Sequence, residues 1–259
     1  MGKKAYQEAC ILGDAKAAAS SADKNFTYIP DCSDLPIRED ASYLYICENN
    51  TIYGTAFAEL PNTKGHVLVA DQSSMFLSQP CDVTKYGLIH AGVQKNVGPA
   101  GVQIVIVRED LIPDNLDGVP TMLRLQTHAA AGSLYNTPPA YGIYICGKVF
   151  KWIEAQGGLA AMDARNRRKA DWLYHTLDKS EIFSATVQGI DRSRMNIPFV
   201  SGNPDLDAVF IKEAAAAGLV GLKGHRSVGG MRASIYNAMP DDGVKALIDF
   251  ITDFEKQHC

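Results

Sequence analysis

Four short apolar segments in the first half of the chain constrain its fold more than any other feature. They are bounded by Gly, Pro, Asn or Asp, and they cover residues 42–46, 67–70, 88–89 and 102–107. Short segments that lack a polar face are typical of strands buried on both sides. Several of them in succession predict an α/β fold in which helices cover a mostly parallel sheet.

The second half of the chain shows more helical pattern. A helix over 141–156 is expected to begin after Pro138-Pro139 and to end at Gly157-Gly158, and apolar residues at helical spacing predict another over 241–257. Further helices are expected over 3–20, 159–177 and 205–218, and further strands over 195–200, 219–222 and 232–235. We place a domain boundary near residue 155, which gives a large domain over 1–155 and a small α/β domain over 156–259.

The helix expected over 159–177 carries a basic cluster. Its members are Arg165, Arg167, Arg168 and Lys169. Because the whole chain has a net charge of −4, we interpret this cluster as a solvent-exposed helix face and not as a patch that binds a polyanion.

Composition excludes several classes of protein. The 259 residues are 46% apolar and 21% charged, and with a net charge of −4 they offer no basic excess for nucleic acid. No apolar run approaches the ~20 residues that a membrane-spanning helix needs, and the first residues do not form a secretory signal. The six cysteines show neither C-x-x-C nor metal-ligand spacing, which fits thiols in a reducing cytosol.

The strongest chemical signal lies in residues 87–101, GLIHAGVQKNVGPAG. Lys95 stands there between a strand-like run and a glycine-rich turn, where backbone can approach a ligand closely. Asp71 follows an earlier strand-like run and falls at the edge of the sheet where α/β proteins bind ligands, although an aspartate in that place can equally be a turn or helix-cap residue. A lysine that forms an imine and a carboxylate that pairs with a pyridine nitrogen are what pyridoxal phosphate (PLP) requires.

The region around these two residues resembles the phosphoserine aminotransferase family, whose members are class V PLP enzymes of fold type I. The resemblance rests on four blocks that together extend over essentially the whole chain. They are ENNTIYG at 48–54, the stretch from VADQSS to IVIVRED at 69–110, LYNTPPAYGIYICGKVFKW at 134–152 and KGHRSVGGMRASIYNAMP at 223–240. It implies a PLP-binding large domain followed by a small C-terminal α/β domain.

The resemblance also implies roles for individual residues. Lys95 is the Schiff-base lysine and the proton shuttle, Asp71 pairs with the pyridine nitrogen, Thr51 bonds the phenolic oxygen, and Gln94 contacts the cofactor phosphate. Asn136 and Thr137 reach across a dimer interface to the cofactor phosphate of the neighbouring subunit. His225 and Arg226 bind the phosphate of the substrate, and Arg232 helps to hold a substrate carboxylate. Without the resemblance, His225-Arg226 would be read as an exposed loop and Thr51 as an ordinary strand residue.

The activity that follows is that of a phosphoserine transaminase. The amino group of L-glutamate passes to 3-phosphooxypyruvate, which gives O-phospho-L-serine and 2-oxoglutarate. A longer phosphorylated acceptor used in pyridoxine biosynthesis is a second substrate in this family. We expect a cytoplasmic homodimer with active sites at the subunit interface, and neither nucleic acid nor membrane as a partner.

The family carries a further N-terminal block that precedes the first helix expected here. That block supplies a glycine-containing loop for the cofactor phosphate, an aromatic residue that stacks on the ring, and a His-Arg pair. We therefore expect the chain to be a fragment of a longer protein, with a natural short form as the competing explanation. We further expect these 259 residues alone to bind PLP weakly or not at all.

Two alternatives remain open on the sequence. One is another class V enzyme, such as an alanine–glyoxylate aminotransferase or a cysteine desulfurase, although neither needs the His225-Arg226 pair. The other is an inactive fragment that acts only as a dimerising module.

Overall fold

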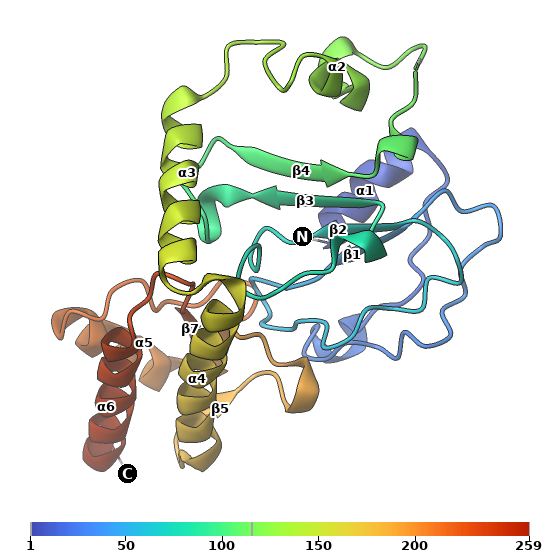
Figure 1. The fold of residues 1–259 in the computed structure, drawn as a ribbon. Coiled ribbons are helices and arrows are strands. Elements are labelled where there is room, and N and C mark those ends of the chain that lie inside the picture. The colour runs from blue at the N-terminus through green and yellow to red at the C-terminus, as the bar shows by residue number, and fades with distance from the viewer. Residues whose placement is uncertain (1, 115, 259) are drawn as a thin grey trace.

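The apolar segments of the first half form one four-stranded sheet in a computed structural model that describes residues 2–114 and 116–258 (Figure 1). The strands are β1 (Leu44–Cys47), β2 (Leu68–Asp71), β3 (Leu88–Gly92) and β4 (Gln103–Val107), in that order across the sheet. β1 and β2 are parallel, as are β2 and β3, whereas β3 and β4 are antiparallel. The prediction of a mostly parallel sheet is confirmed. β4 reverses direction because the connection after β3 is too short for the crossover that a parallel pair needs.

Helix α3 (Ala140–Ala155) lies beside the sheet where β3 ends and β4 begins (Figure 1). Its buried Cys146 packs with inward-facing residues of the strands, among them Ala70, Ile89 and Ala91. The opposite face, which carries Tyr45 and Val69, borders a groove of about 480 Å³. The site residue Asp71 lies on that second face, because side chains two positions apart on a strand point to the same side.

The part of the chain after α3 packs around a separate three-stranded antiparallel sheet, and we refer to this part as the small domain. Its strands are β5 (Ser184–Ala185), β6 (Asn196–Val200) and β7 (Met231–Ser234), and its helices are α4 (Gly158–Lys179), α5 (Pro204–Ala216) and α6 (Asp241–His258). Four phenylalanines meet between the sheet and the helices, and most of their rings contact edge to face. These four residues are Phe183, Phe199, Phe210 and Phe254.

Helix boundaries follow local signals. Asn203 caps α5 by accepting from the backbone N–H groups of Asp205 and Leu206, and Pro204 occupies the first turn. α3 passes into α4 at Gly157, whose φ of +98° is a left-handed conformation that glycine adopts without strain. The predicted domain boundary falls at this break, and the division into 1–155 and 156–259 stays a prediction.

Three expectations about the fold are wrong. The first helix, α1 (Gly2–Leu12), ends before Gly13 and does not extend to residue 20. Residues 219–222 form turns instead of a strand, because Gly218 and Gly221 both adopt positive φ (+88° and +78°). Lys169 is completely buried in α4 and does not belong to a solvent-exposed face.

The remaining elements are short. They comprise α2 (Leu125–Ala130) and 3₁₀ turns at Ala22–Lys24, Val83–Lys85, Val93–Lys95, Glu109–Leu111, Thr121–Leu123 and Gly189–Asp191. None of the helices in the described ranges is both long and apolar enough to cross a membrane.

Candidate active site

Lys95 ends a single 3₁₀ turn that follows β3 directly. Its Nζ donates a hydrogen bond of 2.7 Å to Thr51 Oγ1, and it forms no ion pair with any residue that the structure describes. Burial lowers the pKa of Lys95, and the negative charge of Asp71 opposes that effect. The amine is therefore half-buried, oriented by one hydroxyl group, and closer to its neutral form than an exposed lysine.

Asp71 is the last residue of β2, where it pairs in register with Cys47 of β1 and His90 of β3. It is only 6% exposed, and its Oδ1 accepts a 2.9 Å hydrogen bond from the backbone N–H of Ser73. Its Oδ2 accepts no hydrogen bond from the described residues. The structure thus places a carboxylate with one free oxygen at the carboxyl edge of the parallel strands, where the sequence predicts it.

Arg232 brings the small domain into this site. It lies on β7, and its Nη1 donates to the backbone carbonyl of Thr51 at 3.3 Å. Its Nε is buried and has no hydrogen-bond partner among the described residues, which is costly unless a ligand supplies an acceptor. Thr51 consequently contacts Lys95 through its side chain and Arg232 through its backbone.

The remaining predicted site residues form no hydrogen bond, among the described residues, with Lys95, Thr51, Asp71 or Arg232. The amide of Gln94 folds back against Gly92, whose added Cβ would lie 2.7 Å from Gln94 Oε1. Asn136 and Thr137 are exposed in the segment before α3, where Asn136 Nδ2 lies 3.4 Å from Met122 Sδ. Their roles stay predictions.

His225 and Arg226 occupy a tight loop between Gly224 and β7. The Nδ1 atom of His225 lies 2.7 Å from Ser227 Oγ, and Arg226 is exposed. Arg226 forms no ion pair within residues 2–114 and 116–258, so its charge is available to an anion. Their part in binding a substrate phosphate also stays a prediction.

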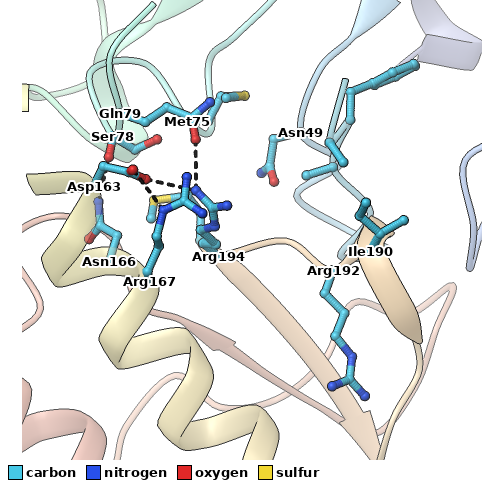
Figure 2. Close-up of a pocket in the computed structure, with 14 residues that line it drawn as sticks. Asn49, Met75, Ser78, Gln79, Asp163, Asn166, Arg167, Ile190, Arg192 and Arg194 are labelled. Atoms are coloured by element: carbon cyan, nitrogen blue, oxygen red, sulfur yellow. Dashed lines mark hydrogen bonds and ion pairs between the residues drawn. The ribbon is translucent and has the colours of Figure 1, made fainter. Parts of the chain in front are cut away.

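A second cavity, of about 390 Å³, lies between the two domains and does not include Lys95, Thr51 or Asp71. Figure 2 shows Arg167 and Arg194 turned toward Asp163, and both donate to that carboxylate at 2.8 Å. Arg192 points away from the cavity and pairs with Asp178. The arginines that line this cavity are thus paired with carboxylates of the same chain, and the predicted site residues lie outside it.

Sequence reasoning missed a set of buried amides beside the site. Asn49, Asn96, Asn166, Asn196 and Asn237 are all less than 10% exposed, and hydrogen bonds connect them across the two domains. Nothing in the sequence pattern marks these residues, since asparagine is more typical of turns than of buried sites.

The residues around Lys95 fit PLP. A ring nitrogen that carries a proton matches the free oxygen of Asp71, and an aldehyde matches the half-buried amine of Lys95. The anionic end of the cofactor finds fewer matches, because Gln94, Asn136 and Thr137 do not converge in this chain.

Comparison with known proteins agrees with this geometry. The model of the aminotransferase class-V family matches residues 5–247. Phosphoserine aminotransferase of Nitrosomonas europaea is 51% identical, over 99% of this chain and 72% of the relative. The structure of phosphoserine aminotransferase from Bacillus circulans subsp. alkalophilus superposes with a TM-score of 0.97 at 44% identity, over 99% of this chain and 72% of that one.

A third comparison concerns the cofactor. The PLP-bound phosphoserine aminotransferase of Trichomonas vaginalis superposes with a TM-score of 0.91 at 38% identity, over 96% of this chain and 72% of that one. Fold, sequence and site therefore agree with the resemblance inferred from the motifs, and the chain belongs to the phosphoserine aminotransferase family of class-V aminotransferases.

Proposed function

We propose that this chain carries the catalytic chemistry of a phosphoserine transaminase. The amino group of L-glutamate is transferred to 3-phosphooxypyruvate, and the products are O-phospho-L-serine and 2-oxoglutarate. The observation that carries the proposal is the half-buried Lys95 amine, which is held by Thr51 and lies in the field of the buried Asp71 carboxylate. Family membership supplies the substrate class.

The cofactor is PLP, as in the family. When bound, it supplies an aldehyde that condenses with amines and a ring that takes up an electron pair. Lys95 would hold the aldehyde carbon, Asp71 the protonated ring nitrogen, Thr51 the phenolic oxygen, and Gln94 the phosphate.

Lys95 would also move the proton. Burial lowers the pKa of Lys95, so near neutral pH the amine is unprotonated in a larger fraction of molecules than the amine of an exposed lysine. The amine can therefore take the proton from the α-carbon of the amino acid at Nζ and then return it. The bond to Thr51 Oγ1 limits the directions in which Nζ can point.

Two basic groups would recognise the two ends of the acceptor. Arg232 offers the unpartnered Nε to a carboxylate, and a guanidinium can bind that group through two hydrogen bonds. His225 and Arg226 offer charge and donors to the phosphate. A longer phosphorylated acceptor of the pyridoxine pathway presents the same two groups, so these residues would accept it as well.

We also propose a homodimer with its active sites at the subunit interface. Support comes from an apolar surface at the start of α3 and just before it, where large side chains are 47–74% exposed. It consists of Leu134, Tyr135, Tyr141, Ile143 and Tyr144. Asn136 and Thr137 lie within this surface, which is where residues that reach the neighbouring subunit's cofactor would be placed. A cytoplasmic location fits the free thiols of Cys10, Cys32, Cys47, Cys81 and Cys146.

Trapping the cofactor by reduction tests the proposal. The chain is incubated with millimolar PLP, reduced with borohydride and digested, and the labelled peptide is identified by mass spectrometry. Because PLP binding to this chain is expected to be weak, we expect the label on Lys95 and transaminase turnover with glutamate and 3-phosphooxypyruvate only in this excess of PLP, and loss of both in Lys95→Ala. Label on another lysine, or a folded dimer that is neither labelled nor active, would overturn the proposal and favour the dimerising module.

A further inference from the structure

Asn49, at the end of β1, is a buried amide whose hydrogen-bonding groups are all used. It is 3% exposed, its Nδ2 donates to Ser74 Oγ at 2.7 Å and to Asn196 Oδ1 at 3.0 Å, and its Oδ1 accepts from Ser193 Oγ at 2.5 Å. Ser74 Oγ in turn donates its proton to the backbone carbonyl of Asn49, so the NH₂ group of Asn49 must face Ser74. The orientation of the amide is therefore fixed by its partners.

These partners come from both domains. Ser74 belongs to the turn that follows Asp71, whereas Ser193 and Asn196 belong to the small domain and are completely buried. Asn196 also donates to Ser234 on the neighbouring strand β7, which carries Arg232. Figure 2 shows Asn49 on the side of the interdomain cavity opposite Asp163.

The loop that begins at Asn49 presents Thr51. It is closed on itself by the bonds from Asn50 N to Thr55 O (2.7 Å) and from Gly54 N to Asn50 O (2.8 Å). Such a closed loop moves as a unit, so its placement depends on its two anchored ends. Asn49 holds the first end through its side chain and its bridge to Ala56, and backbone bonds from Ser193 N to Gly54 O (2.8 Å) and from Ala56 N to Asp191 O (2.9 Å) hold the second.

We propose that Asn49 is a positioning residue for the active site. Its amide anchors the Thr51 loop to the small domain and thereby holds Thr51 Oγ1 against Lys95 Nζ and Thr51 O against Arg232. The inference rests on the proposed function only for what Lys95 does in catalysis, since the contacts exist in the chain without any ligand.

The hydrogen bond from Lys95 Nζ to Thr51 Oγ1 has a measurable consequence for the pKa of Lys95. The charged and titratable groups that act on this amine are Asp71, Cys47 and Arg232, and Asp71 and Arg232 act in opposite directions. The Thr51 oxygen accepts a hydrogen bond from Nζ and so favours the ammonium form. Displacing Thr51 therefore lowers the pKa of Lys95, by about one pH unit for one hydrogen bond to a charged group.

The test measures that pKa in the cofactor-free chain. Amine acylation is followed as a function of pH, and the modification of the Lys95 peptide is quantified by mass spectrometry. We expect the pKa to fall by about one unit in Thr51→Val, so that Lys95 reacts roughly tenfold faster at a fixed pH below its pKa. In Asn49→Ala we expect a smaller fall in the same direction, because the backbone bonds at Gly54 and Ala56 still hold the far end of the loop. The double variant should show no further fall, because both changes remove the same contact.

Asp207→Ala is the matched control. Asp207 is also buried, and its Oδ1 accepts two hydrogen bonds from Ser201 within the small domain, but it has no link to Thr51. It should lower the unfolding temperature without changing the pKa of Lys95. Ser74→Ala removes one partner of Asn49 and should shift the pKa in the same direction by a smaller amount, which decides the question if Asn49→Ala does not fold.

The proposal is overturned if Asn49→Ala or Ser74→Ala lowers the unfolding temperature and leaves the pKa of Lys95 unchanged. Additive shifts in the double variant would overturn it as well. Because no cofactor or turnover enters the measurement, a failure of the proposed transaminase activity would leave this result intact, and the reverse also holds.

Discussion

Lys169 allows a quantitative prediction of how stability depends on pH. The side chain is 0% exposed within α4, and its Nζ donates to the carbonyls of Ile235, Tyr236 and Met239 at 3.2, 2.9 and 3.1 Å. Burial lowers the pKa of Lys169 to about 8, with Arg165 and Arg168 adding to the effect and Asp241 opposing it. The substitution that tests this is Lys169→Met, which nearly keeps the length of the side chain and removes its charge.

The direction in which the free energy of unfolding changes with pH follows from how many protons each state binds. In the unfolded chain the amine keeps its proton up to its ordinary pKa of 10.5, whereas in the folded chain it loses the proton above about 8. Between these values the unfolded state binds more protons, so the free energy of unfolding rises with pH. From pH 7 to pH 10 the gain is at most about 2.5 kcal/mol, at 1.36 kcal/mol per pH unit.

Urea unfolding of the wild-type protein and the Lys169→Met variant at several pH values from 7 to 10 measures this gain. The wild-type protein should become more stable relative to the variant as pH rises, and the ionisation of buried tyrosines, which is common to both proteins, cancels in the difference. Lys245→Met, on the exposed side of α6, should show no such trend. A difference that is flat, or that falls with pH, would refute the reasoning and would mean that the three carbonyl groups keep the buried amine charged.

Two further substitutions test packing. Phe210→Ala removes the ring that contacts Phe183, Phe199 and Phe254 and should lower the free energy of unfolding by about 3–5 kcal/mol in urea, so a loss below about 1 kcal/mol would contradict the described core. Gly54→Ala places a Cβ at 2.3 Å from Pro198 Cδ, whereas Gly118→Ala has the same backbone strain (φ +78° against +79°) and meets no atom of the described residues within 4 Å. Thermal unfolding should therefore show a larger loss for Gly54→Ala, and equal losses would contradict the contact between the two domains at Gly54.

The spacing of apolar residues along the sequence predicts those helices and strands that bury one regularly repeating face. The apolar spacing over 241–257 predicts α6, where Val244, Leu247, Ile251 and Phe254 are buried. It fails at 219–222, because a short apolar run looks the same in a turn as in a strand, and the glycines at both sides decide the outcome. It fails at Lys169 for a different reason: the carbonyl groups that accept its hydrogen bonds lie 66–70 residues away along the chain.

Lys95 and Asp71 could be predicted because each follows a strand, and the carboxyl ends of neighbouring parallel strands meet at one edge of a sheet. Thr51 has no such signal and is expected only from the resemblance to a family. Asn49 has no signal at all, since its amide is defined by contacts to residues 25, 144 and 147 positions away. The strand ends thus locate the groups that we propose to react, whereas the contacts between residues 49–51 and residues 193–232 decide how closely those groups approach one another. For that reason the distance between Lys95 and Thr51 depends on side chains that pattern analysis treats as turn residues, and it can be inferred only from the folded chain.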